Sequence, residues 1–437
     1  MINILHITPH FGGGIGTVLF SLIPELQKIP NYHHEIVSLE YANSKAKEWS
    51  FQNGVTIYEE VSPTDVLLHQ KMQNVDIVHL HFWNHPLLYH LLHSFAGKRA
   101  RVIIWSHVNG HHAPYLFNDY ILEFPLFFVS STPYSSTQKN IIQKEIQWKK
   151  EHYRCVHSCS GINEYDRIIP VEHEKFNVGY IGTVDYSKMH HNFLDICDKI
   201  KVPDAHFIVV GGDSQEEIYN EALKKKIGDK FSFTGKVDDI KDYLASFDIF
   251  FYPLNRKNYG TGEQVLIEAM SAGMPQVVFA DGPEEFVVQD NITGFVVNDE
   301  EDFVAAVEKL YKDKILLKKM SFASKRYAKE KFTIDKSVAA WTSIYHEALE
   351  KDKKRCNFKQ LKEKDLALSL FLLALGDCDA ADIYRKMLNH FPSPSPTYLK
   401  VQYKQQDPVF HGKTKGSVKH YNRFFKNHKL QYITEQI

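Results

Sequence analysis

Apolar positions in this chain fall in short runs that alternate with helix-length segments. Such runs are typical of parallel strands that are buried on both faces, because helices cover each face of a parallel sheet. In the first half the predicted strands are Ile2–Thr8, Glu35–Glu40, Asp76–Trp83, Arg101–Val108, Phe127–Ser131 and Tyr153–Ser158. The pattern predicts an α/β fold with a doubly wound parallel sheet.

The same alternation recurs in the second half of the chain. There the predicted strands are Asn177–Ile181, His206–Val210, Phe231–Thr234, Ile249–Leu254, Gln276–Ala280 and Gly294–Val297. With 437 residues the chain exceeds the size at which single cores stop growing, so we predict two Rossmann-like domains, over residues 1–165 and 166–350. Ligands of open sheets bind outside the carboxyl ends of the strands, so two such domains facing each other would enclose one cleft.

The pattern changes after residue 350. Leu361–Leu375 and Ala380–Leu388 are predicted as two helices of an appendage over residues 351–397, and the proline-rich segment from Phe391 to Pro396 ends regular structure. Residues 398–437 form a basic aromatic tail, with eight Lys or Arg against two acids and seven Tyr or Phe. A tail packed on the domains and a contact with a membrane surface or an anionic acceptor both remain open.

Composition excludes several classes of protein. The chain has 52 Lys and Arg against 53 Asp and Glu, so it has no overall charge bias toward nucleic acid or membrane. No stretch reaches the roughly 18 uninterrupted apolar residues of a spanning helix, and the first residues lack the features of a signal peptide. We therefore expect a cytoplasmic protein. A membrane contact of the tail, if that alternative holds, would be peripheral and at the inner membrane surface.

Neither the cysteines nor the paired aspartates indicate a metal site. The five cysteines are scattered like reduced thiols, and Cys155 and Cys159 share a strand face at an awkward spacing for metal ligands. The pair Asp377 and Asp379 lies in the appendage, far in sequence from the glycine loops. We predict no metal site and no cofactor.

The segment from Asn258 to Pro275 carries the most specific chemistry. Gly260 and Gly262 allow a ligand to approach the backbone, and a helix from about Glu263 to Ala272 presents unpaired N–H groups to an anion. A nucleotide diphosphate fits this arrangement. Glu268 lies one turn further in, where a carboxylate would bond ribose hydroxyls. The alternative is a glycine loop that caps an ordinary helix.

Several motifs together resemble the retaining GT-B glycosyltransferases of family 4. The resemblance covers roughly residues 2–350 and is strongest in the second domain, where the motifs follow in the family's order and spacing. These motifs are Val178-Gly-Tyr-Ile-Gly182, Ile208-Val-Val-Gly-Gly212, Phe233-Thr-Gly235, Phe247-Asp-Ile-Phe-Phe-Tyr-Pro253, Glu268-Ala-Met-Ser-Ala-Gly273-Met-Pro275 and Asn291-Ile-Thr-Gly-Phe-Val296. Ser160-Gly161-Ile162-Asn163 resembles the family's signal that enters the interdomain link.

The resemblance implies a donor site in the second domain. Glu268 would hold the donor ribose, and Lys188 would pair with the phosphates. The other implied donor-binding residues are Gly260, Thr261, Gly262, Gln264, Gly182 and Thr183. This scheme needs a nucleotide sugar as substrate and no metal.

Two positions depart from the family pattern. Gly260 stands where the family commonly has a glutamate that contacts the transferred sugar, and Thr183 stands where a basic residue is common. Glu263 either compensates for the missing glutamate as a catalytic residue or is a carboxylate favoured by the helix dipole. Lys188 is left as the main phosphate cation.

In the first domain the resemblance implies acceptor-side loops. The glycine loop with Gly12, Gly13 and Gly14 belongs to this group, as does His81. His107 would shape the subsite of the donor sugar or its charge distribution. Weaker candidates are His79, His111, His112, Glu284 and Glu285.

We therefore predict a metal-independent retaining hexosyltransferase that moves a sugar from a nucleotide sugar to a glycan or lipid-linked acceptor, as in polysaccharide biosynthesis. A sugar-nucleotide epimerase with the same two-domain plan and a catalytically degenerate binding subunit remain open. A nicotinamide-dependent dehydrogenase fits less well, because the loop from Gly12 to Gly16 lacks the Gly-x-Gly-x-x-Gly spacing.

Overall fold

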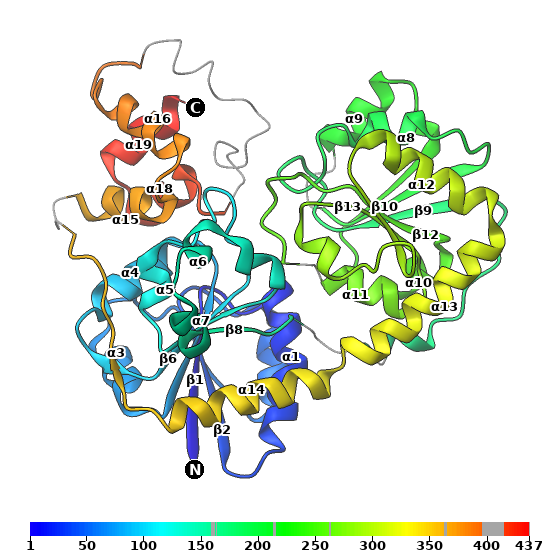
Figure 1. Cartoon of the computed structure of the whole chain (residues 1–437). Coiled ribbons are helices and arrows are strands. Elements are labelled where there is room, and N and C mark those ends of the chain that lie inside the picture. Colours follow the sequence, from blue (N-terminus) through cyan, green and yellow to red (C-terminus); the bar gives the residue numbers. More distant parts are fainter. Residues whose placement is uncertain are drawn as a thin grey trace. The chain divides into compact units, whose positions relative to one another are not determined.

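The computed structural model describes residues 1–158, 162, 164–212, 216–261, 264–361, 365–395 and 415–436. The chain divides into two compact units: Met1–Ser160 with Ser337–Ile437, and Gly161–Lys336 (Figure 1). The predicted domain boundary at residue 350 differs from this division. Most of helix α14 (Ile334–Leu349) belongs to the first unit, where its buried Trp341 and Tyr345 pack on His79.

The first unit is built on a seven-stranded parallel sheet in the order β3-β2-β1-β4-β6-β7-β8. Its strands are β1 (Ile2–Thr8), β2 (Tyr32–Ser38), β3 (Thr56–Tyr58), β4 (Ile77–Phe82), β6 (Val102–Ser106), β7 (Phe127–Ser130) and β8 (Tyr153–Cys155). The six predicted strands are confirmed. Sequence reasoning missed β3, because its three residues are half-buried or exposed and form no apolar run. A short antiparallel pair joins β5 (Arg99–Ala100) to β15 (Lys354–Arg355).

Helices connect these strands and cover the sheet. They are α1 (Gly13–Gln27), α2 (Ser44–Asn53), α3 (Val66–Asn74), α4 (Pro86–Phe95), α5 (Asp119–Glu123), α6 (Lys139–Ile142) and α7 (Ile146–His152), with the 3-10 helix η1 (Pro133–Thr137). Side-chain caps fix several starts: Asn43 accepts a hydrogen bond from the Ala46 amide, and Asp65 accepts from Leu67.

The second unit has a six-stranded parallel sheet in the order β11-β10-β9-β12-β13-β14. Its strands are β9 (Phe176–Ile181), β10 (Ala205–Val210), β11 (Phe231–Gly235), β12 (Ile249–Tyr252), β13 (Gln276–Phe279) and β14 (Gly294–Val297), which confirms all six predictions. Helices α8 (Phe193–Lys199), α9 (Glu216–Lys224) and α12 (Glu300–Lys312) lie on one side, and α10 (Lys241–Ser246), α11 (Gln264–Ser271) and α13 (Lys314–Lys331) on the other (Figure 1). Short 3-10 helices are η2 (Tyr165–Arg167), η3 (Gly228–Lys230) and η4 (Pro283–Phe286).

The predicted appendage is present as α15 (Leu366–Leu375) and α16 (Asp379–Leu388). The prediction that regular structure ends near Phe391 is wrong, because α18 (Val418–Phe425) and α19 (His428–Gln436) follow. Both short helices bury apolar residues against α15 and α16, which local periodicity does not reveal. Residues 398–414 of the tail lie outside the described part of the chain. Among the described residues, no helix is long and apolar enough to cross a membrane.

Candidate functional site

Two loops of the second unit meet beside the carboxyl ends of β9 and β12. The backbone amide of Asn255 donates to the carbonyl of Lys188 at 2.8 Å, and the Asn255 side chain donates to the carbonyl of Tyr186 at 2.9 Å. Within the second loop, the amide of Gly260 donates to the Asn258 side-chain oxygen at 2.7 Å. These bonds tie the loop after β9 to the glycine loop that precedes α11.

Lys188 is brought to the glycine loop by this arrangement. The side chain is buried, with 4% of the residue exposed, and its Nζ lies 4.9 Å from the ring centroid of Tyr259. Tyr259 immediately precedes Gly260, so a cation lies next to the backbone predicted to hold a diphosphate. An ammonium over an aromatic face is attracted by the quadrupole of the ring.

Glu268 lies one turn into α11 and is buried. Burial raises the pKa of its carboxyl to about 7, although hydrogen bonds from Gln264 and Tyr165 act to lower it. The Gln264 bond is 3.2 Å long, from Nε2 to Oε1. A buried carboxyl with so perturbed a pKa is unusual on a helix that is merely structural, so Glu268 is the strongest site candidate in this unit.

The remaining donor-side candidates surround this core. Thr261 and Gln264 are half-buried. Gly262 and Glu263 lie outside the described residues, so the role of Glu263 stays a prediction. At the end of β9 Thr183 is exposed, and its carbonyl accepts a 2.8 Å hydrogen bond from the Tyr180 hydroxyl.

Gly182 lies in a tight backbone crossing in the same loop. A Cβ added at its neighbour Gly211 would lie 2.3 Å from the Gly182 carbonyl oxygen. Only glycine fits at that crossing, because Gly211 also has a φ of +109°.

In the first unit the predicted glycine loop connects β1 to α1. Gly12 has a φ of +145°, and a Cβ there would lie 2.4 Å from Asn43 Nδ2. Gly13 and Gly14 are exposed at the start of α1. The loop therefore presents bare backbone at the carboxyl edge of the sheet, where the acceptor-side contact was predicted.

His107 follows β6 at the same edge of this sheet and is half-buried. Its Nε2 lies 3.1 Å from Nδ1 of His81, and its Nδ1 lies 3.5 Å from the Ser158 hydroxyl. Burial lowers the pKa of His107 to about 3, so the ring is neutral. His81 itself is fully buried and contacts His107 and His6, which gives it a supporting position and no open surface.

The structure adds residues that the sequence did not suggest. Tyr165 bonds Glu268 from the segment that enters the second unit, and Tyr259 covers Lys188. The sequence does contain a signal for Tyr259, because this aromatic residue stands directly before the glycine motif.

The two weaker carboxylate candidates differ in their surroundings. Glu284 is buried in η4, whereas Glu285 accepts a hydrogen bond from the Asp281 amide.

Two groups among the described residues have nitrogen or oxygen atoms spaced for a metal ion. One is His6, His79 and His81, and the other is His190, His191 and Glu300. Neither group contains a residue of the predicted donor loop.

Comparison with known proteins finds a family match within the second unit. Residues 162–327 match the family model of Glycosyl transferases group 1. Over 379 residues the chain is 24% identical to the N-acetyl-alpha-D-glucosaminyl L-malate synthase of Bacillus anthracis. The alignment covers 78% of this chain and 96% of that enzyme.

Solved structures agree with the architecture. HepE of Anabaena, in complex with UDP and glucose, superposes with a TM-score of 0.64 at 15% identity, over 79% of this chain and 100% of HepE. The pneumococcal O-GlcNAc transferase GtfA, in complex with UDP and GlcNAc, gives a TM-score of 0.59 at 11% identity, over 80% and 99%. The fold is therefore GT-B, as predicted, and it includes a domain of the Glycosyl transferases group 1 type.

Proposed function

We propose that this GT-B chain, whose residues 162–327 form a Glycosyl transferases group 1 domain, is a metal-independent retaining hexosyltransferase. It moves a sugar from a nucleotide-sugar donor to a glycan or lipid-linked acceptor in the cytoplasm. The observation that carries the proposal is that the segment around the glycine loop buries both a carboxyl, Glu268 one turn into α11, and a cation, Lys188 beside Tyr259.

Glu268 and Lys188 each have a task in glycosyl transfer. Breaking the glycosyl phosphate bond builds negative charge on the departing diphosphate, and fixed donors stabilise that charge without reorganising. The N–H groups at the start of α11 and Lys188 are such donors. Glu268 would accept hydrogen bonds from the ribose hydroxyls, and the leaving phosphate would accept the proton of the acceptor hydroxyl.

The solved neighbours suggest which donor to test first. HepE was crystallised with UDP and glucose, and the pneumococcal enzyme with UDP and GlcNAc. UDP-glucose and UDP-GlcNAc are therefore our first candidate donors. The similarity to the N-acetyl-alpha-D-glucosaminyl L-malate synthase adds small carboxylate acceptors such as L-malate to the glycan and lipid-linked acceptors worth assaying.

Thermal stabilisation by a panel of nucleotide sugars tests the proposal. A ligand at 100 times its dissociation constant adds about 2.7 kcal/mol to the free energy of unfolding. We expect stabilisation by one donor and its nucleoside diphosphate, affinities within about twofold in EDTA, and transfer or hydrolysis of that donor. Loss of donor binding in EDTA that magnesium restores would refute the metal-independent scheme, and stabilisation without turnover would favour a binding subunit.

A further inference from the structure

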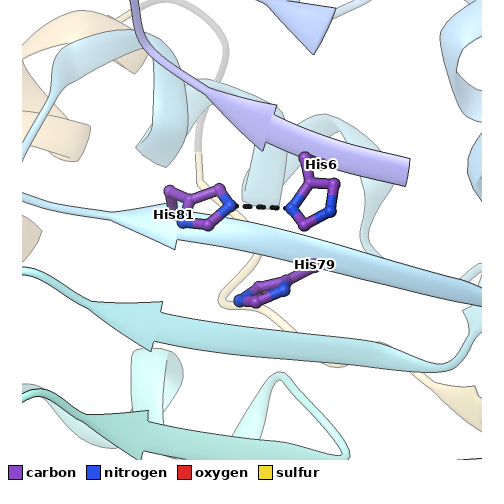
Figure 2. A group of neighbouring side chains, drawn as sticks. All are labelled: His6, His79 and His81. Carbon is purple, nitrogen blue, oxygen red and sulfur yellow. Dashed lines mark hydrogen bonds between the residues drawn. The ribbon is translucent and has the colours of Figure 1, made fainter. Parts of the chain in front are cut away.

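Four histidines form a continuous hydrogen-bonded row across the first unit's sheet. His34 in β2, His6 in β1, His81 in β4 and His107 after β6 follow the order of neighbouring strands. The links measure 2.9 Å between His34 and His6, 3.0 Å between His6 and His81, and 3.1 Å between His81 and His107. Figure 2 shows the central link, with His79 beside it. We name these four residues the histidine row.

The row runs head to tail. In every link the Nδ1 of one ring faces the Nε2 of the next ring. A neutral imidazole has one N–H donor and one acceptor nitrogen. Two proton arrangements therefore satisfy every link: all four rings protonated on Nδ1, or all four on Nε2. Any mixture places two N–H groups or two lone pairs against each other.

Hydroxyls at the end of the row select one arrangement. Nδ1 of His107 faces the Ser158 hydroxyl at 3.5 Å, Ser158 donates to Ser131 at 3.0 Å, and Ser131 donates to the backbone carbonyl of Ser106 at 2.6 Å. A carbonyl oxygen only accepts hydrogen bonds, so the Ser131 proton points to the Ser106 carbonyl and the Ser158 proton points to Ser131. Ser158 can then only accept from His107, which places the His107 proton on Nδ1.

The opposite end agrees with this direction. Nε2 of His34 is buried and has no hydrogen-bond partner among the residues that the structure describes. With the protons on Nδ1 this atom is a lone pair, and an orphaned buried acceptor is better tolerated than an orphaned N–H. Burial lowers the pKa of His34 and His107 to about 3 and that of His6 and His81 well below the usual value, so all four rings are neutral.

We propose that His34, His6 and His81 are positioning residues, which hold His107 as a neutral Nδ1–H tautomer at the carboxyl edge of the first unit's sheet. The inference rests on the proposed function and on the role that the family resemblance implies for His107, which is to shape the subsite of the donor sugar. Positive charge develops on the sugar ring during transfer, and an imidazolium next to it would oppose that charge strongly in a site shielded from water. A neutral ring with a fixed proton avoids the repulsion.

The same region contains the metal-like group of His6, His79 and His81, and its geometry favours the row. Nδ1 of His6 and Nε2 of His81 already bond each other, and Nδ1 of His79 bonds the Tyr345 hydroxyl at 2.7 Å. The rings of His79 and His81 are stacked, with centroids 4.5 Å apart and planes at 24°. The in-plane lone pairs of stacked rings lie in two separate and nearly parallel planes, whereas a zinc site needs lone pairs that converge on one point.

Nitrogen NMR of the full chain with ¹⁵N-labelled histidine tests the tautomers directly. We expect a protonated Nδ1 and an unprotonated Nε2 on all four rings of the row throughout the pH range 5.5 to 8, with no change when zinc chloride is added. A proton on Nε2 of His107, or a charged His107, would overturn the proposal. So would zinc binding that shifts His6, His79 and His81 together. This measurement stands even if the chain transfers no sugar.

Two adjacent serines provide a matched pair of variants. Ser131→Ala releases the Ser158 proton, so His107 loses its fixed direction, and we expect mixed tautomers and a kcat lowered at least about tenfold. The donor KM should stay within about threefold, because ground-state binding is not removed. Ser130→Ala removes bonds to the Tyr153 hydroxyl and the Thr132 carbonyl but leaves the row intact. Equal losses of kcat in the two variants would contradict the proposal.

A second pair tests the middle of the row at constant size. In His6→Asn the side-chain amide can donate to His81 from the position of the original Nδ1, whereas His6→Leu removes the donor. We expect His6→Asn to recover most of the kcat that His6→Leu loses, and only His6→Leu to mix the tautomers of His107. Tyr345→Phe is the control, because it removes a bond to His79 outside the row. Full kcat in His6→Leu with unchanged tautomers would reject the positioning role.

Discussion

At the scale of single residues, Glu268 is the group whose environment most constrains function. Its carboxyl is buried within α11, has two neutral hydrogen-bond partners, and has a pKa of about 7. Most buried carboxylates are paired with a cation, which would lower the pKa instead. A ligand with two hydroxyl donors would satisfy this carboxylate, which is the reason for assigning it to ribose.

Glu268→Gln should weaken the donor and its nucleoside diphosphate equally. The lost charge-assisted bonds are to ribose and contribute about 1.5 to 3 kcal/mol at pH 8. Because the wild-type carboxyl must ionise to bind, its affinity for the diphosphate should fall up to about tenfold between pH 8 and 6. Titration calorimetry on both proteins measures this. The variant controls for titration of the phosphate itself, and an identical pH dependence in the variant would exclude the ribose role.

The same pKa predicts an effect on stability without ligand. The folded pKa of about 7 lies above the ordinary value of 4.5, so between these values the folded chain retains a proton that the unfolded chain releases. The stability of the wild type should therefore fall as pH rises from about 4.5 to 7, by on the order of 2 to 3 kcal/mol. Glu268→Gln stays neutral, so its melting temperature relative to wild type should be higher at pH 8 than at pH 5. Parallel melting curves would show that burial does not perturb this carboxyl.

At the scale of secondary-structure elements, the helix after the glycine loop is the element on which the predicted diphosphate site depends most. Helix α11 begins at Gln264, directly after the loop, and its first turn contains no acidic residue of its own. Lys188 reaches the loop because the strands β9 and β12 are neighbours in the sheet. The order of the parallel strands therefore brings together the two segments of the predicted diphosphate site, which are far apart in the sequence.

Glu263 immediately precedes this helix, and its two alternative roles separate cleanly. If it replaces the missing glutamate, Glu263→Gln should lower turnover while leaving diphosphate affinity and melting temperature unchanged. If it only complements the helix dipole, the variant should lose about 0.3 to 1 kcal/mol of stability and keep its turnover. Steady-state kinetics and thermal melts on one preparation distinguish these results. We expect the first.

At the scale of the whole molecule, the C-terminal segment has both a packing face and a charged face. Tyr421 is buried against Phe371 of α15, with ring centroids 5.2 Å apart. Lys419 and Arg423 are exposed at i, i+4 positions on one face of α18, and Lys426, which caps the end of this helix, is also exposed. Truncation of the tail would disturb the packing, so it cannot by itself test membrane binding.

Replacing Lys419, Arg423 and Lys426 together by Gln removes only the charged face. Each cation near an anionic surface contributes about 1 kcal/mol, so sedimentation with anionic liposomes should weaken on the order of a hundredfold. The melting temperature and donor hydrolysis should stay as in wild type. Neutral liposomes are the control, and unchanged sedimentation on anionic liposomes would leave this segment with a packing role alone.

The sequence by itself determined the architecture of both units. Apolar runs marked twelve of the strands, because a strand that is covered on both faces needs a continuous run of apolar residues, as in Ile249 to Tyr252, and such a run is visible in the sequence. The glycine loop and the position of Glu268 one turn into a helix could also be predicted from the sequence, since both depend on residues that are neighbours in the chain.

Only the tertiary structure decided which distant groups meet. It placed most of α14 in the first unit through Trp341 and Tyr345, folded the C-terminal residues onto α15, and brought Lys188 over Tyr259. It also aligned the histidine row, whose members appear in sequence as separate strand residues. Hydrogen-bond direction and burial depend on the order and register of strands, which local periodicity does not contain.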